Sequence, residues 1–278
     1  MTKAEYQFIR ALASGPTADV YLCTEQIAGS PGKTVVLKIL RSNWLENQIG
    51  VQHLQEDIQL LSRLNHRNIT DIYSVVPIRG KTTLVTEYVQ GIDLKRLISA
   101  MREMKQRIPL KISFEIIANV ARALDEAYNQ PPSPKEWPLR LMHGNLKPSN
   151  IMIQSNGLVR ILDFGLVHSE LGSRESFTRE LQFEEQDYLA PERLFFEPQS
   201  SSADIYSLSV TLFEMIAGKP FRRKAASESE HKKRVQSYVK KLLSTLKLGS
   251  ESKKELYDLL ASGLEYQAEH RPTADQLS

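Results

Sequence analysis

Two polar loops in the middle of the chain carry residue types that can do chemistry. The first is His143–Asn150, and the second begins with the carboxylate of Asp163. A carboxylate is a hard oxygen ligand of the kind that suits Mg²⁺. The amide of Asn145 can hydrogen-bond a hydroxyl group, but it cannot accept a proton as a base does. Short apolar strands, expected at Ile151–Ile153 and Leu158–Leu162, separate the two loops and must position them.

The order of these residues resembles the protein-kinase family, whose catalytic loop reads H-R-D-L-x-x-x-N and is followed by D-F-G. The resemblance implies that Lys147 stabilises the transferring phosphate. It also implies that Asn150 and Asp163 hold Mg²⁺ while the chain binds ATP. Asn145 stands where the family has its catalytic aspartate. Gly144 stands where many kinases have an arginine that pairs with a phosphorylated activation loop.

The substitution at Asn145 bears on the rate of any reaction. Phosphoryl transfer has a loose transition state, so positioning and electrostatics matter more than removal of a proton. Loss of the base is therefore expected to slow transfer about 10²–10⁴-fold. A slow residual activity would still be compatible with this sequence.

The start of the chain predicts three strands, Tyr6–Leu12, Asp19–Gln26 and Thr34–Leu40. The turn at Gly15 resembles the Gly-rich loop of kinases, although Ala13 and Ala18 replace two of its glycines. Glycine lets backbone N–H groups approach phosphate because it has no Cβ. Read alone, such a turn is more often a plain hairpin that binds nothing.

A lysine at the end of the third strand, Lys38, resembles the lysine of the V-A-I-K strand, which holds the α- and β-phosphates. Ser42–Leu64 has helical spacing. The resemblance implies that Asp57 on this helix, or Glu56 just before it, pairs with Lys38. A solvent-exposed charge is the alternative for each of these three residues.

The segment Leu84–Val89 resembles the hinge that receives adenine in kinases. Thr86 falls at the gatekeeper position and is small, so an open pocket is expected behind the adenine. Asp93 falls where the family binds a ribose, and it is equally suited to cap the next helix, Leu94–Met104. The nucleotide-binding residues that the resemblance implies are Gly15, Val20, Val36, Lys38, Thr86, Glu87, Val89, Asp93 and Met152.

The second half of the chain predicts mainly helices. Ser113–Tyr128 is periodic, with Phe114, Ile117, Val120, Ala121, Leu124 and Tyr128 expected on its buried face. Asp204 resembles the aspartate that holds the catalytic-loop backbone, and it also suits a helix N-cap. Arg271 resembles the terminal arginine of the family, which implies a buried pair with Glu192. The resemblance also assigns structural roles to His143 and Phe164, as members of an apolar stack with Leu61 and Ile72.

Composition is that of an ordinary globular protein. The chain has 278 residues, 41% hydrophobic residues and a net charge of +3, which gives no argument for a nucleic-acid or membrane partner. Cys23 is the single cysteine, so no internal disulfide forms and a reducing, cytoplasmic compartment is expected. No apolar run reaches the roughly 18 residues of a membrane span.

The whole chain, 1–278, is thus expected to form one α+β protein-kinase-like domain. The β-rich N-lobe would cover about 1–87, the hinge about 87–92 and the helical C-lobe about 93–278. The sequence stops inside what looks like a starting helix, which suggests a domain cut from a longer protein, such as the cytoplasmic part of one.

Two regions could contact protein partners. In the activation segment, Asp163–Glu192, the pair Glu184 and Glu185 replaces the usual Gly-Thr. Glu185 could pair with Lys147, or the two acids could form an exposed turn. The basic region 222–241 could bind an acidic partner, or it could be a solvated helical face.

Two main functions follow from these residues. The first is a pseudokinase that retains some ATP and Mg²⁺ binding and acts in signalling through protein contacts. The second is an active but atypical Ser/Thr kinase of bacterial type, supported by the retained Lys38, Lys147, Asn150 and Asp163. A phosphotransferase for small molecules is disfavoured by the motif Tyr188–Glu192 and by Arg271.

Overall fold

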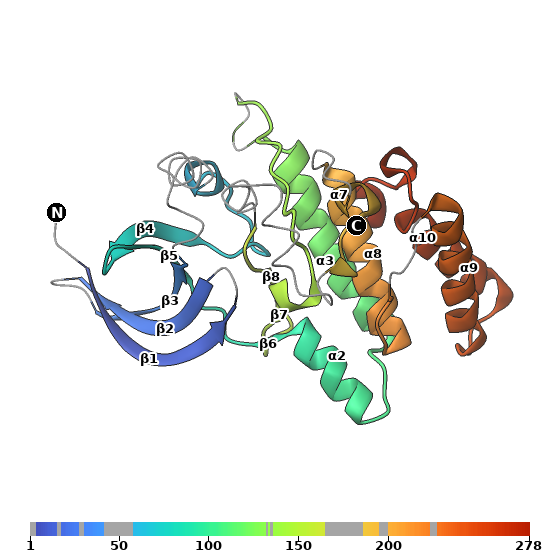
Figure 1. Cartoon of the computed structure of the whole chain (residues 1–278), viewed down its shortest axis with the longest axis horizontal. Helices are drawn as coiled ribbons and strands as arrows, with labels where there is room; N and C mark the ends of the chain where they lie inside the picture. Colours follow the sequence, from blue (N-terminus) through green and yellow to red (C-terminus); the bar gives the residue numbers. More distant parts are fainter. Residues whose placement is uncertain are drawn as a thin grey trace. The chain divides into compact units, whose positions relative to one another are not determined.

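The fold is known from a computed structural model that describes residues 4–15, 18–27, 31–41, 58–131, 133, 136–164, 186–194, 200–222 and 227–278. The chain divides into two compact units (Figure 1). Of the described residues, those up to 90 form the first unit, and those in 91–164 and 186–278 form the second.

The first unit is built on a five-stranded antiparallel sheet. Its strands are β1 (Glu5–Ser14), β2 (Ala18–Gln26), β3 (Lys33–Leu40), β4 (Ile72–Ile78) and β5 (Lys81–Glu87). They lie in the order β1-β2-β3-β5-β4. The first three strands lie within a few residues of the predicted ranges. Residues 58–61 are helical and belong to the predicted helix Ser42–Leu64, of which residues 42–57 lie outside the described part of the chain.

One face of this sheet forms a small core. Buried residues Cys23, Val35, Leu37 and Val85 contact one another there. Side chains alternate between faces along a strand, so apolar residues at every second position, such as Tyr21 and Cys23 or Val35 and Leu37, define that core. The intervening residues of β2 and β3 are therefore on the opposite face.

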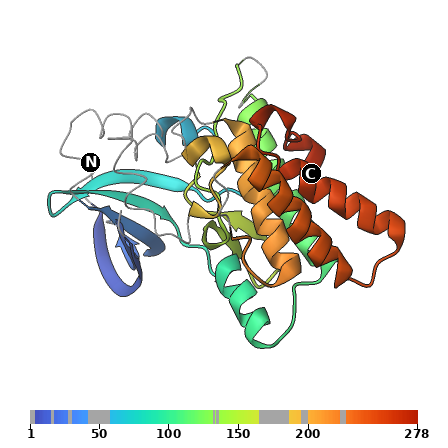
Figure 2. The same cartoon turned by 45° about the vertical axis from the view of Figure 1, so that its right-hand side comes forward.

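The second unit is mainly helical. Its helices of ten or more residues are α2 (Leu94–Glu103), α3 (Leu110–Asn129), α8 (Ser201–Ala217), α9 (Glu228–Ser244) and α10 (Ser250–Gly263). Shorter elements are α7 (Pro191–Leu194), η2 (Pro148–Asn150), η3 (Ala268–His270) and η4 (Asp275–Leu277). Figures 1 and 2 both show α3 beside α8, with α9 and α10 on the other side of α8.

Helix α8 is the centre of this unit. It is buried on nearly every side, as its largely apolar sequence predicts. Gly263 at the end of α10 comes so close to α8 that a Cβ there would lie 2.9 Å from the Cβ of Ser209. Glycine at 263 therefore allows α10 to pack directly against α8.

The buried face of α3 includes the predicted Ile117, Val120, Ala121 and Leu124, but it differs at the N-terminal end of the helix. The helix begins at Leu110, three residues before the expected Ser113, and buries Ser113 itself. Phe114, expected in the core, is 38% exposed. The buried face also contains the small residues Ser113, Ala123 and Ala127. A pattern of large apolar residues does not predict their burial. The helices described here include none long and apolar enough to cross a bilayer.

A second, three-stranded sheet lies at the start of this unit. It contains β6 (Ile92–Asp93), β7 (Ile151–Ile153) and β8 (Val159–Ile161), in that order. Strands β7 and β8 match the two short strands predicted between the polar loops. Because Ile151 is paired with Ile161, these strands place Asn150 and Asp163 at the same open end of one hairpin.

Candidate catalytic loop and nucleotide site

The loop 143–150 is held in place by the buried carboxylate of Asp204. The backbone N–H of His143 donates to Asp204 Oδ2 at 2.8 Å, and the backbone N–H of Gly144 donates to Asp204 Oδ1 at 2.8 Å. Asp204 is the fourth residue of α8, whose N-cap is Ser200, so the N-cap alternative for Asp204 is wrong. The carboxylate instead anchors a loop that is distant in sequence. Burial raises its pKa to about 6, against the opposing effect of the two N–H donors.

The ring of His143 fixes the loop from inside. The backbone N–H of Asn145 donates to Nδ1 at 3.2 Å, and Nε2 lies 3.0 Å from the carbonyl oxygen of Leu162. A neutral ring that carries its proton on Nε2 satisfies both contacts. Burial lowers the pKa of His143 to about 4, which favours this neutral form. The ring also contacts Phe164, with centroids 5.4 Å apart.

Two residues of the polar loops have left-handed backbones. Gly144 has φ +76° and Asp163 has φ +57°. Glycine adopts this conformation without a steric penalty, whereas most other residues do not. Gly144 therefore suits the backbone conformation at its position. This role is separate from the absence of the arginine that many kinases have there. Asp163 adopts the same conformation at the start of the second loop, where αL costs an aspartate little.

The asparagine expected to bind Mg²⁺ is oriented by the loop itself. Asn150 Nδ2 donates to the carbonyl oxygen of Asn145 at 2.9 Å, so its Oδ1 remains the amide's ligand atom. The backbone carbonyl of Asn150 accepts the N–H of Leu162 at 2.8 Å. Asn145, Asn150 and the residue before Asp163 are thus joined by hydrogen bonds. An amide oxygen and a carboxylate fit a Mg²⁺ ion that takes its other ligands from phosphate and water.

In the first unit, the register brings predicted nucleotide-site residues to one face of the sheet. Val20 is paired with Lys38, and Val36 with Thr86. Residues directly opposite each other in antiparallel strands share a face, as do residues two apart on one strand. Val20, Val36, Lys38 and Thr86 therefore lie on the face opposite the Val35 core. Val36 and Thr86 are buried, and Lys38 is partly buried.

Asp93 and Met152, two other predicted nucleotide-site residues, are paired across β6 and β7. Asp93 also caps α2, since its Oδ1 accepts the N–H of Arg96 at 2.9 Å. Gly91, just before β6, has no room for a side chain, because a Cβ there would lie 2.9 Å from the carbonyl carbon of Ile153. This close approach of Gly91 to the Ile153 backbone was not predicted, because a single sequence does not show which distant residues come into contact.

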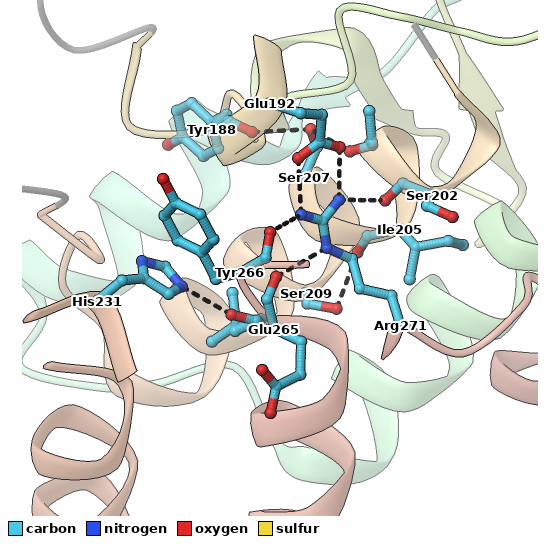
Figure 3. A network of polar contacts seen from close by, with 12 residues as sticks. Tyr188, Glu192, Ser202, Ile205, Ser207, Ser209, His231, Glu265, Tyr266 and Arg271 are labelled. Carbon is cyan, nitrogen blue, oxygen red and sulfur yellow. Dashed lines mark hydrogen bonds and ion pairs between the residues drawn. The ribbon is translucent and has the colours of Figure 1, made fainter. Parts of the chain in front are cut away.

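The predicted pair of Glu192 and Arg271 is present and buried. The guanidinium donates to both carboxylate oxygens at 2.7 Å, and the two side chains are 9% and 0% exposed. Figure 3 shows that Arg271 also reaches the carbonyl oxygens of Ser202, Glu265 and Tyr266. One arginine therefore ties α7, α8 and the segment before η3 together.

A second polar contact joins the segment before α7 to α8. Tyr188 Oη donates to Glu214 Oε2 at 2.7 Å, and the Phe221 N–H donates to Glu214 Oε1 at 3.2 Å. Burial raises the pKa of Glu214. Ser207 Oγ on the same helix donates to the Tyr188 carbonyl at 2.8 Å. The end of the activation segment is thus fixed to the central helix.

Several predicted residues lie outside the described part of the chain. They include both candidates for the Lys38 partner, Glu56 and Asp57, and the acids Glu184 and Glu185.

Three further residues predicted to bind the nucleotide are described. The N–H of Gly15 donates to the Ala18 carbonyl at 2.9 Å. Glu87 N–H donates to the Asp71 carbonyl at 3.0 Å. Val89 is buried.

Comparison with known proteins agrees with these features. The sequence profile of the family described as "Protein kinase domain" matches residues 6–278. A probable serine/threonine-protein kinase, PknB of Lactococcus lactis, is 30% identical over 220 residues, which are 78% of this chain and 32% of that protein. The serine/threonine-protein kinase PrkC of Bacillus subtilis is 28% identical over 222 residues, 80% of this chain and 32% of that protein. The chain thus spans about a third of the length of these relatives.

Solved structures support the fold. The PknI kinase domain of Mycobacterium tuberculosis superposes with a TM-score of 0.70 at 20% identity, covering 98% of this chain and 93% of that one. The α+β kinase-like fold predicted from the sequence, with a five-stranded antiparallel sheet in the N-lobe and a helical C-lobe, is confirmed.

Proposed function

The chain belongs to the protein kinase family, and we propose that it is a catalytically impaired member that binds ATP with Mg²⁺ and acts in signalling through protein contacts. The observation that carries this proposal is the amide of Asn145 at the position of the catalytic base. The loop around it is otherwise anchored, by Asp204 at one end and by Asn150 at the other. The side chain that would accept a proton is missing from a loop that is built to hold it.

In this proposal the other residues of the site bind the nucleotide. Lys38 holds the α- and β-phosphates, and the backbone of the Gly15 turn approaches them. Mg²⁺ would be held by the amide oxygen of Asn150 and the carboxylate of Asp163, and it would neutralise phosphate charge when bound. Lys147 would face the phosphate that is transferred. Asn145 would hydrogen-bond a hydroxyl group without removing its proton.

An active but atypical Ser/Thr kinase is the second candidate. It is favoured by the retention of Lys38, Lys147, Asn150 and Asp163, and by the relatives whose names include serine/threonine-protein kinase. The two candidates share a nucleotide site and differ only in whether phosphoryl transfer occurs at a useful rate. A binding measurement and a transfer measurement therefore separate them.

For partner contacts we propose the basic face of α9. Its exposed cations are Lys232, Lys233, Lys240 and Lys241. Val235, Val239 and Leu242 on the other side of the helix are buried, so the cationic side faces water. Charge complementarity makes an acidic protein segment the partner, and the activation segment is the other candidate contact. We propose a cytoplasmic location, because the single cysteine, Cys23, leaves the chain without an internal disulfide.

Thermal unfolding with and without Mg-ATP tests the nucleotide site. A ligand that binds only the folded state at 100 times its Kd adds about 2.7 kcal/mol to the free energy of unfolding. We expect a Mg²⁺-dependent rise in Tm that Lys38→Ala abolishes. Lys33→Ala is the matched control, because Lys33 is on the same strand but lies over the Tyr73 ring. No shift at millimolar ATP would contradict the nucleotide part of the proposal.

A further inference from the structure

A polar cluster lies next to the Gly15 turn, at the closed end of the β1–β2 hairpin. Its side chains have no role in the site described above. Ser14 Oγ donates to Asp19 Oδ1 at 2.6 Å. One guanidinium nitrogen of Arg41 donates to both atoms, at 2.9 Å to Ser14 Oγ and 2.8 Å to Asp19 Oδ1. We call Ser14, Asp19 and Arg41 the hairpin clamp. The Arg41 guanidinium and then the Ser14 hydroxyl hold the pKa of Asp19 below its usual range, so the carboxylate stays ionised.

The clamp joins the two arms of the Gly15 turn to a third strand. Ser14 ends β1 and is the register partner of Asp19 on β2. Between them, the N–H of Gly15 donates to the carbonyl of Ala18. Arg41 directly follows β3, whose last residue, Leu40, is paired with Ala18. A change at Arg41 therefore acts on both sides of the turn at once.

The clamp lies on the far side of the sheet from Lys38. Asp19 is paired with Ile39, whereas Val20 is paired with Lys38. Neighbouring residues on a strand point to opposite faces. Arg41 therefore cannot touch a group bound beside Lys38, and any influence it has on such a group must pass through the Gly15 turn.

We propose that Arg41 is a positioning residue, which fixes the Gly15 turn from the outer face so that its backbone N–H groups meet the phosphates of a nucleotide. The consequence for the nucleotide depends on the proposed function, whereas the effect on the turn does not. Ala13 and Ala18 stand where the family has glycines, so the turn has less freedom to adjust to a phosphate. A turn of this kind must be held in the right place beforehand.

Amide hydrogen exchange of the whole chain, followed by mass spectrometry, tests the clamp without a ligand. In Arg41→Ala we expect exchange across residues 13–20 to rise by up to about fivefold, the range for losing an exposed ion pair. Asp19→Asn should give a smaller rise, and Arg41→Lys should restore part of the protection. Arg10→Ala, which removes an exposed charge from the same hairpin, should change nothing there. Salt at 1 M should raise exchange in the unaltered chain but not in Arg41→Ala.

Two outcomes would overturn the proposal. One is unchanged exchange at residues 13–20 in Arg41→Ala. The other is an equal rise across all five strands, which would mean a general loss of stability. Titration with Mg-ATP then tests the consequence: Arg41→Ala should weaken binding by a similar factor, and equal affinity would overturn the positioning role. If the unaltered chain binds no Mg-ATP, the proposed function fails, and the exchange result alone decides whether the clamp holds the turn.

Discussion

The buried carboxylate of Asp204 accepts the backbone N–H of Gly144 at 2.8 Å, across sixty positions of sequence. This hydrogen bond and the one that Asp204 accepts from the backbone N–H of His143 set the conformation of the loop that contains Asn145. The loop is therefore held by the central helix α8 as well as by its own side chains, His143 and Asn150. Its anchoring does not depend on the side chain that is present at the position of the base.

The titration of this anchor gives the first prediction. Burial raises the pKa of Asp204 from 3.8 to about 6, so the folded chain binds more protons than the unfolded chain between about pH 4 and 6. The contribution of Asp204 to the free energy of unfolding therefore falls as the pH rises through that range. Burial lowers the pKa of His143 from 6.5 to about 4, so the unfolded chain binds more protons and stabilisation rises between about pH 4 and 6.5. The two effects oppose each other.

Urea unfolding between pH 4.5 and 7.5 separates them. In Asp204→Asn the free energy of unfolding should rise more steeply with pH than in the unaltered chain, because only the His143 effect remains. In His143→Gln it should fall with rising pH, because only the Asp204 effect remains. Parallel pH profiles in all three proteins would contradict the assignment of these two pKa shifts.

The second prediction concerns the left-handed backbone of Gly144. Replacement by alanine should lower the free energy of unfolding by about 1 kcal/mol, because a Cβ is strained at φ +76°. Gly144→Asn is the matched comparison and should cost less, because asparagine tolerates a left-handed backbone better than alanine does. Equal stability of the two variants in urea would contradict a cost from the left-handed backbone at this position.

The third prediction concerns the buried pair of Glu192 and Arg271. Breaking one partner leaves an uncompensated buried charge, so Arg271→Met should cost about 3–5 kcal/mol. Combining it with Glu192→Gln should recover part of that loss, since the carboxylate is then neutral. A double-mutant cycle in urea measures the coupling. Strict additivity of the two changes would contradict a direct interaction.

The fourth prediction concerns the contact of α10 with α8. Gly263→Ala should destabilise the chain by about 1–3 kcal/mol, because its new methyl group meets the side chain of Ser209. Ser209→Gly opens space at that point, so the double variant should be more stable than the sum of the single changes predicts. If Gly263→Ala costs the same in both backgrounds, the two helices are not in tight contact there.

Much of this architecture could be predicted from the sequence, because local patterns encode it. Local sequence patterns predicted β1 to β3, with a β-branched run in β3, and the motif order predicted the Glu192–Arg271 pair. The buried face of α3 was predicted correctly from Ile117 to Leu124 but not at its start, where Ser113 is buried and Phe114 is exposed. Close approaches at Gly91 and Gly263 depend on partners distant in sequence, which no local pattern reveals. The hairpin clamp uses exposed charges, and exposed charges have many possible partners.

The most direct test of the account is phosphoryl transfer by Asn145→Asp. With radiolabelled ATP, Mg²⁺ and a generic protein substrate, this variant should transfer phosphate about 10²–10⁴-fold faster than the unaltered chain. Lys38→Ala in the same background should abolish the gain. Both proteins should show the same Mg-ATP-dependent rise in Tm, because Asn145 is not proposed to hold the nucleotide. Equal transfer rates with and without the aspartate would contradict the claim that Asn145 is what impairs this kinase domain.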